Sequence, residues 1–134
     1  MRVLIANDDG IDAVGIRVLA ERFARENEVM VVAPMNQRSG FSHSLTIDED
    51  ILFEKKTGAF TAYAISGTPA DCTKTGVLYF NDGQPFDLVL SGINNGANLG
   101  TDILYSGTVA AATEGAMHGI PSIAISLQKW NCSE

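Results

Sequence analysis

The sequence predicts an α/β protein, a three-layer α/β/α sandwich around a mainly parallel sheet. Short apolar runs alternate along the chain with segments whose apolar residues recur at helical spacing, which is typical of strands joined by helical crossovers. Two of the apolar runs end abruptly in polar, glycine-containing loops, as strands buried on both faces do. The 134 residues, 46% of them hydrophobic, are enough for the core of one domain.

The first expected elements are a strand, an amphipathic helix and a second strand. Residues 3–5 form a continuous apolar run that meets polar residues abruptly. From Val14 onward, apolar residues fall on one side of a helix, at Ile16, Leu19, Ala20 and Phe23. A second apolar run, 29–33, is stopped by Pro34. Residues 2–33 therefore have the length that a β-α-β unit with parallel strands requires.

The middle of the chain is expected to hold a loop, two shorter strands and a helix. Residues 35–45 carry glycine, asparagine and serine without periodicity, which is typical of a surface loop. Strands are expected at 46–53 and 60–66. A helix is expected from Thr68 to about Tyr79, because its start combines a hydroxyl N-cap, a proline in the first helical position and an acid in the first turn, at Thr68, Pro69 and Asp71.

The last third of the chain repeats the alternation of strand and helix. Residues 86–90 form another buried strand, which leads into a polar, glycine-rich loop at 91–100. A helix of small residues is expected from about Gly107 to His118, followed by a final apolar strand at 122–126. In sheets of this kind, ligands collect outside the carboxyl ends of the strands.

Charge and cysteine content exclude several classes of function. The formal net charge is −7 with only 9 Lys and Arg, so the chain lacks the basic surface that binding of a nucleic acid polymer requires. Cys72 and Cys132 match no metal-binding or redox spacing, which favours a reducing cytoplasm. The apolar run near the N-terminus is too short for a signal peptide or a membrane span. We therefore expect an acidic cytoplasmic protein without a membrane partner.

The adjacent acids Asp8 and Asp9 directly follow the first expected strand. Two neighbouring carboxylates in a crevice repel each other, and a hard divalent cation with oxygen ligands offsets that repulsion. An alternative remains open at this point, because Asn7 to Gly10 can also form an Asx-type turn that caps the first helix. The pair thus predicts either a metal site or a structural turn.

Polar residues in two further strand-end loops are candidate companions of these acids. The loop after the second strand carries Ser39, together with Arg38, Ser42, His43 and Ser44, and the loop after residues 86–90 carries Asn94, Asn95 and Asn98. Their hydroxyl and amide oxygens suit magnesium or manganese. Each is also an ordinary loop-forming residue. His43 can assist proton transfer from this position, whereas His118 near a helix end complements the helix dipole.

The start of the small-residue helix is a candidate phosphate seat. Ser106, Gly107 and Thr108 stand at this start, where free backbone N–H groups and the positive end of the dipole attract an anion. The structural alternative is an N-cap made by Ser106 or Thr108. The two interpretations are compatible, since a capped helix start can also receive a ligand.

Several blocks in sequence order resemble the SurE family. They are Asn7-Asp8-Asp9-Gly10, Val32-Ala33-Pro34 with Arg38-Ser39-Gly40, Gly67-Thr68-Pro69-Ala70-Asp71-Cys72, Ser91-Gly92-Ile93-Asn94 with Gly96 and Asn98, and Tyr105-Ser106-Gly107-Thr108-Val109. The resemblance implies a Rossmann-like domain. It also implies a divalent-metal-dependent phosphomonoesterase acting on nucleoside monophosphates, a 5′-nucleotidase, with 3′-nucleotidase and exopolyphosphatase activity in some members.

The resemblance also implies a site. Transferred residue by residue, it makes Asp8, Asp9, Ser39 and Asn94 the ligands of one magnesium or manganese ion. Asp8 and Asp9 are then the catalytic carboxylates, one of which accepts a proton from the attacking water or serves as nucleophile; both options remain open. The phosphate is expected among Asn7, Asn98, Ser106, Gly107 and Thr108.

Members of the family continue well beyond the length of this chain. Residues 1–134 are therefore expected to form a single SurE core domain that lacks the family's C-terminal portion, which supplies further sheet and an arm for subunit exchange. At full length, a homodimer or homotetramer is expected.

The main alternative is a magnesium-binding receiver-like signalling domain without hydrolase activity. Such a domain requires a further Asp after its third strand and a Lys after its fifth, but the chain reads Leu52-Phe53-Glu54 and Ser126-Leu127-Gln128. A haloacid-dehalogenase-like phosphatase separates its two acids by one residue, and here they are adjacent. A dinucleotide-binding domain is disfavoured because no Gly-x-Gly-x-x-Gly follows the first strand.

Overall fold

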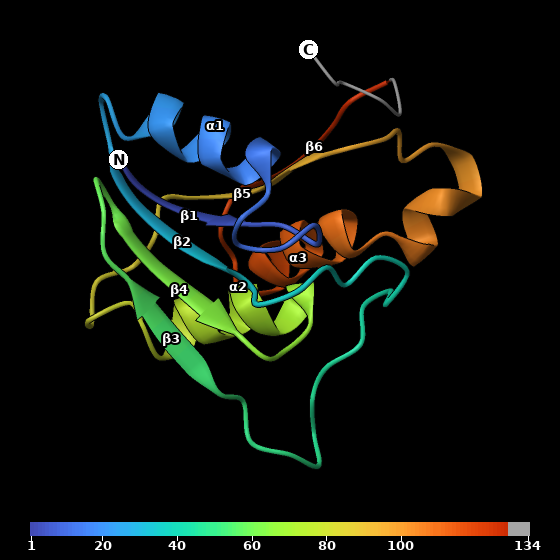
Figure 1. The fold of residues 1–134 in the computed structure, drawn as a ribbon, viewed down its shortest axis with the longest axis horizontal. Coiled ribbons are helices and arrows are strands. Elements are labelled where there is room, and N and C mark those ends of the chain that lie inside the picture. The colour runs from blue at the N-terminus through green and yellow to red at the C-terminus, as the bar shows by residue number, and fades with distance from the viewer. Residues whose placement is uncertain (129–134) are drawn as a thin grey trace.

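A computed structural model describes residues 1–128 and contains a six-stranded sheet with helices on both faces (Figure 1). Its elements in chain order are β1 (Arg2–Ala6), α1 (Val14–Phe23), β2 (Glu28–Pro34), β3 (Phe53–Lys56), β4 (Thr61–Ile65), α2 (Pro69–Leu78), β5 (Leu88–Asn94), the 3₁₀ helix η1 (Gly100–Tyr105), α3 (Gly107–Met117) and β6 (Ser122–Ser126). The predicted three-layer α/β/α class is confirmed.

The sheet has the strand order β3-β4-β2-β1-β5-β6. The pairs β1–β2, β1–β5, β2–β4 and β5–β6 are parallel, and β3–β4 is antiparallel. Ile5 on β1 lies opposite Val31 on one neighbour and Leu90 on the other. The chain winds from β1 toward β2 and β4 first and returns to the other side of β1 with β5. The carboxyl end of β1 is therefore the switch point at which such sheets bind ligands.

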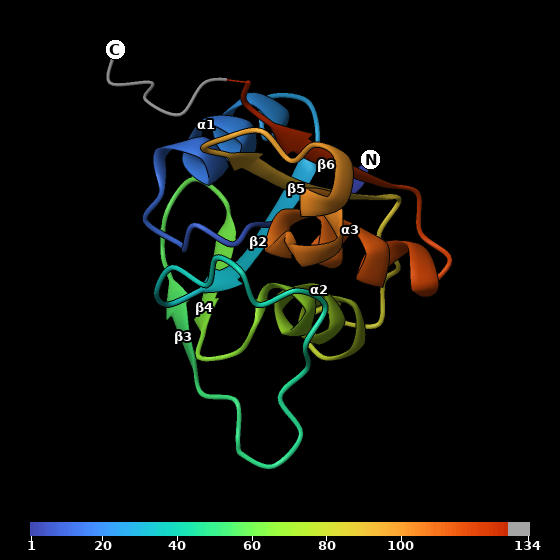
Figure 2. The same ribbon diagram turned by 90° about the vertical axis from the view of Figure 1, so that its right-hand side faces the viewer.

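Alternate residues of β1 build two cores. Val3 and Ile5 pack beneath α1 with Ile16 and Leu19, while Leu4 and Ala6 face α2 and α3 on the opposite side of the sheet (Figure 2). All five residues of β1 are buried, which explains why the strand is apolar from Val3 to Ala6. Full burial of one such aliphatic side chain stabilises the fold by about 1.5–3 kcal/mol, so the central strand holds both helical layers in place.

The predicted start of α2 is confirmed. The Thr68 hydroxyl accepts a hydrogen bond from the Asp71 amide at 3.1 Å, and the Asp71 carboxylate accepts one from the Thr68 amide at 2.8 Å. Pro69 occupies the first helical position. This reciprocal capping satisfies N–H groups that would otherwise lack partners at the helix start.

The strand predicted at 46–53 is wrong. The strand in this region is β3, Phe53–Lys56, and residues 46–52 are irregular. Thr46 is drawn toward α2 instead of the sheet, because its amide and its hydroxyl both donate to the Asp71 carboxylate. The Leu52 amide donates to the hydroxyl of Ser66. At Thr46 and Leu52, side-chain acceptors thus take the amide hydrogen bonds that a strand partner would otherwise accept.

Two further differences affect the site. The strand expected at 86–90 is β5, Leu88–Asn94, which extends into the segment expected to be a loop and pairs Asn94 with Ser126 of β6. The helix η1 was not predicted. Both changes depend on contacts with distant parts of the chain, which local sequence patterns do not report.

Cys72 is a free, buried thiol on α2. Cys132, the other cysteine of that prediction, lies outside the described residues. No helix within residues 1–128 combines the length and apolar character needed to cross a membrane.

Candidate metal and phosphate site

The carboxyl ends of β1, β2 and β5 border an open cavity of about 370 Å³, here called the carboxyl-end cavity. In Figure 1 this edge of the sheet lies toward the right, where η1 extends. The cavity is lined by Asp8, Asp9, Gln37, Ser39, Gly40, Asn94, Asn95, Ala97, Asn98, Asp102, Tyr105 and Ser106. All four residues expected to bind a metal line it. Three segments that are far apart in the sequence are therefore brought together.

Asp8 is the most buried acid of the cavity, with 4% of its surface exposed. Its Oδ1 accepts a hydrogen bond of 2.8 Å from the hydroxyl of Thr108 on α3. Burial raises the pKa of Asp8, and the nearby charge of Asp9 raises it further, whereas the Thr108 hydrogen bond acts in the opposite direction. A cation bound beside Asp8 would stabilise its charged form.

Asp9 is less buried than Asp8 and faces the β5 side of the cavity. Its Oδ2 accepts a hydrogen bond of 3.2 Å from the Asn95 amide. This contact joins the loop after β1 to the loop after β5. The two carboxylates thus have different surroundings, one enclosed by α3 and one held by a backbone amide.

An Asx-type turn is present beside these acids, but Asn7 forms it. The Asn7 side chain donates to the Gly10 carbonyl at 2.8 Å and accepts from the Gly10 amide at 3.2 Å. Gly10 has a φ of 103°, which a residue with a Cβ rarely adopts. The N-cap of α1 is Ala13, without a side-chain cap. The turn therefore leaves both carboxylates available, and Asn7, fully buried, does not line the cavity.

The loop after β2, residues 35–46, is here called the Ser39 loop. The Arg38 amide donates to the Asp8 carbonyl at 2.7 Å, and the Arg38 side chain donates to the Ser66 carbonyl at 3.1 Å. Gln37 donates to the Ser39 hydroxyl oxygen at 3.0 Å. These contacts fasten the first part of the loop to the end of β1, so that Ser39 lies at the cavity.

Asn94 ends β5, and its side-chain amide donates to the Gly96 carbonyl at 2.9 Å. Because the side-chain nitrogen of Asn94 donates this bond, its side-chain carbonyl oxygen is the atom suited to a cation. Asn98 donates to the Ser126 hydroxyl at 2.7 Å and so ties the following loop to β6. Both residues line the cavity, as expected.

The three residues at the start of α3 have different environments. Ser106 lines the cavity and is the N-cap, since its hydroxyl accepts a hydrogen bond from the Val109 amide at 3.2 Å. Gly107 and Thr108 are not among the residues that line the cavity. They lie against Asp8 instead. Their backbone N–H groups belong to the first helical turn, which has no intrahelical acceptors. The start of α3 thus combines a cap and a support for Asp8 with backbone N–H groups that have no acceptor within the helix.

Sequence reasoning missed part of the lining. Gln37, Gly40, Ala97, Asp102 and Tyr105 also border the cavity. The proximity of Gln37 to Ser39 in sequence is a usable signal, whereas Asp102 reaches the cavity through the unpredicted helix η1. His43, considered for proton transfer, does not line the cavity.

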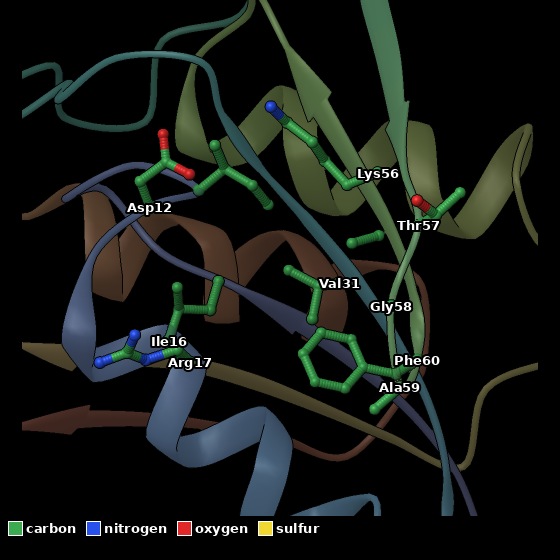
Figure 3. Close-up of a pocket in the computed structure, with 11 residues that line it drawn as sticks. Asp12, Ile16, Arg17, Val31, Lys56, Thr57, Gly58, Ala59 and Phe60 are labelled. Carbon is green, nitrogen blue, oxygen red and sulfur yellow. The ribbon is translucent and has the colours of Figure 1, made fainter.

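A different cavity of about 320 Å³ lies between α1 and the turn that joins β3 to β4 (Figure 3). Its floor is apolar, with Ile16, Val31 and Phe60, and Arg17 and Lys56 stand at its margin. None of the predicted site residues lines it. The carboxyl-end cavity is therefore the candidate functional site.

The donors of the carboxyl-end cavity suit a hard cation. Residues 1–128 contain no group of three or more His, Cys, Asp or Glu that could hold a metal. A cation in this cavity would instead have two carboxylates, the Ser39 hydroxyl and the Asn94 carbonyl oxygen. An all-oxygen set with room for water matches magnesium or manganese and disfavours zinc.

Comparison with known proteins supports the resemblance seen in the sequence. The model of the family described as "Survival protein SurE" matches residues 3–134. The chain belongs to the SurE family. A 5′-nucleotidase SurE from Clostridium botulinum is 52% identical over 135 residues, covering 98% of this chain and 53% of the relative. One from Syntrophus aciditrophicus is 49% identical, covering 95% and 48%.

A solved structure agrees with this family assignment. The crystal structure of the SurE protein from Aquifex aeolicus superimposes with a TM-score of 0.89 at 45% identity, covering 99% of this chain and 54% of that protein. The chain spans about half the length of the SurE relatives it matches.

Proposed function

We propose that this chain carries the metal and phosphate site of a divalent-metal-dependent phosphomonoesterase that hydrolyses nucleoside 5′-monophosphates. The observation that carries the proposal is the meeting of Asp8, Asp9, Ser39 and Asn94 at one cavity at the switch point of the sheet. The relatives named 5′-nucleotidase SurE support the reaction class. The all-oxygen donor set supports one Mg²⁺ or Mn²⁺ ion per subunit.

Asp8, Asp9, Ser39 and Asn94 would hold the ion, which when bound would polarise the phosphate and lower the pKa of a water molecule. Asp9 is the better acceptor for the proton of the attacking water, because Asp8 is enclosed and hydrogen-bonded to Thr108. The N–H groups at the start of α3, with Ser106 as cap, would receive the phosphate charge.

Several finer properties belong to the proposal. The net charge of −7 favours small nucleotides over nucleic acid polymers. Activity on 3′-nucleotides and on polyphosphate, a cytoplasmic location and a homodimer or homotetramer at the relatives' full length are proposed from the family resemblance. A receiver-like role is disfavoured, since the chain lacks the further acid and the lysine that such a domain uses.

The test combines metal binding with phosphate release. Mn²⁺ binding to the 134-residue chain is measured by the loss of free-ion electron paramagnetic resonance, for the wild type, Asp8→Asn and the exposed-acid control Asp48→Asn. We expect binding by the wild type and the control only. Phosphate release from a panel of nucleoside monophosphates, with and without chelator, is measured on this chain and on one extended to the relatives' length. Full Mn²⁺ affinity in Asp8→Asn would overturn the assignment of the site.

A further inference from the structure

A carboxylate buried on α3 lies between two histidines. Glu114 is only 4% exposed, and its two oxygens accept separate hydrogen bonds. Oε2 accepts one of 2.6 Å from Nε2 of His43, and Oε1 accepts one of 3.1 Å from Nε2 of His118. A buried carboxylate needs such donors, because its removal from water is costly. Both histidines therefore matter to Glu114, but they come from different parts of the fold.

His118 is local to Glu114, whereas His43 is distant. His118 caps the C-terminal end of α3, four residues after Glu114, so its contact stays within one helix end. His43 belongs to the Ser39 loop and is 71 residues away in sequence. Only the His43 contact joins that loop to α3. The two histidines thus form a natural pair of test and control.

The His43 contact lies in the last third of the loop, between two other fastenings and directly beside the second of them. At its start, the Arg38 amide donates to the Asp8 carbonyl. At its end, the Ser44 carbonyl accepts a hydrogen bond of 2.6 Å from the Thr68 hydroxyl. His43 follows Ser39 by four residues, a length of chain that spans at most about 14 Å. A movement of His43 is therefore transmitted to Ser39 over a short distance.

The same helix borders the cavity at its other end. Ser106, the N-cap of α3, lines the cavity with Ser39 and Gly40, and Glu114 lies roughly 12 Å further along the helix axis. The Ser39 loop and the start of α3 therefore border the same cavity, and the His43 contact joins the loop to α3 at Glu114. This contact helps to define the position of the loop relative to the helix start.

We propose that the His43–Glu114 hydrogen bond is a latch that fixes the Ser39 loop against α3, and so sets the position of the Ser39 hydroxyl relative to the cation and the helix start. This inference rests on the proposed function of the cavity. His43 and Glu114 are positioning residues, since they touch neither the cation nor the phosphate. Without the latch the loop would stay fastened at Arg38 and at Ser44, and the segment between them, which carries the Ser39 hydroxyl, would be free to shift relative to α3.

The test is the Mn²⁺ affinity of the 134-residue chain in matched variants. We expect His43→Ala to lower the affinity about 10-fold or more, as loss of a residue that orients a ligand does. His118→Ala removes a hydrogen bond from the same carboxylate and is expected to leave the affinity unchanged. His43→Asn retains a side-chain donor and is expected to recover part of the loss, and it serves as the test if His43→Ala does not fold.

A double-mutant cycle identifies the route of the effect. In a Ser39→Ala background, His43→Ala should cause no additional loss, because the latch acts through Ser39. An additional loss there, or equal losses in His43→Ala and His118→Ala, would overturn the latch. If Asp8→Asn abolishes Mn²⁺ binding while His43→Ala keeps wild-type affinity, the latch alone fails. If Asp8→Asn also keeps wild-type affinity, the metal site itself fails.

Discussion

Gly107 links the packing of α3 to the proposed metal site. A Cβ at this position would lie 2.8 Å from the Cβ of Asp8 and 2.9 Å from Cγ of Pro69. Carbon atoms in ordinary contact are about 3.5–4.0 Å apart, so in Gly107→Ala the start of α3 must move by roughly 0.7 Å or more. Overpacking of this kind costs about 1–3 kcal/mol. The higher helix propensity of alanine, worth at most about 1 kcal/mol, offsets part of this cost.

We therefore expect Gly107→Ala to lower the free energy of unfolding by about 1–2 kcal/mol and Tm by roughly 4–8 °C. The same Cβ would lie 3.2 Å from Oδ2 of Asp8, so the carboxylate must also move, and Mn²⁺ affinity should fall by about 10-fold or more. Urea unfolding in the presence of chelator measures the first effect. Titration of Mn²⁺ followed by electron paramagnetic resonance measures the second.

Gly76→Ala, on α2, is the matched control. A Cβ there would lie 2.8 Å from Cδ1 of Leu4, in the core rather than at the cavity. Its stability should fall by a similar amount, about 1–3 kcal/mol, while its Mn²⁺ affinity stays at the wild-type value. Wild-type Mn²⁺ affinity in Gly107→Ala, together with reduced stability, would refute the dependence of the Asp8 carboxylate on the close approach of α3.

The remaining predictions concern Asp8, its hydrogen-bond partner and the core. Because the pKa of Asp8 is raised in the folded state, the metal-free protein loses stability as pH rises from the ordinary value of 3.8 through the raised value. Asp8→Asn lacks this loss and should be more stable than wild type in chelator at pH 7, but not at pH 3, in urea unfolding. Thr108→Val removes the hydrogen bond that opposes this rise, so Mn²⁺ titrations at several pH values should show binding that begins at higher pH than in the wild type. Ile16→Val, on the opposite face of the sheet, should reduce the unfolding free energy by about 0.5–1.5 kcal/mol with unchanged Mn²⁺ affinity, and a change in affinity would show that core packing alone perturbs the site.

The parts of the fold that local patterns encode were predicted correctly. The β-α-β unit of β1, α1 and β2 follows from apolar periodicity over a few residues at a time, and the capping box of α2 lies within four consecutive residues. The segment 46–52 was predicted incorrectly, because its partner Asp71 lies 25 residues away from Thr46. The continuation of β5 to Asn94 depends on its pairing with Ser126 of β6, which no pattern in the sequence near Asn94 reports.

The same distinction holds for the candidate site. Asp8, Ser39 and Asn94 were placed near one another because parallel strands end at one edge of a sheet, and all three line the cavity. Their roles as ligands remain predictions. The supporting contacts could not be predicted in this way, since Thr108 and Asp8 are 100 residues apart, and His43 and Glu114 are 71 apart. Neither pair produces a periodicity or a residue spacing that could be recognised in the sequence.

The hydrogen bond between Thr108 and Asp8 also has a consequence for the dynamics of the chain. It connects the loop after β1 with α3, the last helix of the described residues, so the cavity exists only while both of these elements are in place. Opening of either β1 or α3 would separate the donors and release the ion. An ion bound at this point should therefore slow amide hydrogen exchange in both elements together, although it touches only a few residues. Occupancy of the site would then report the integrity of the whole domain.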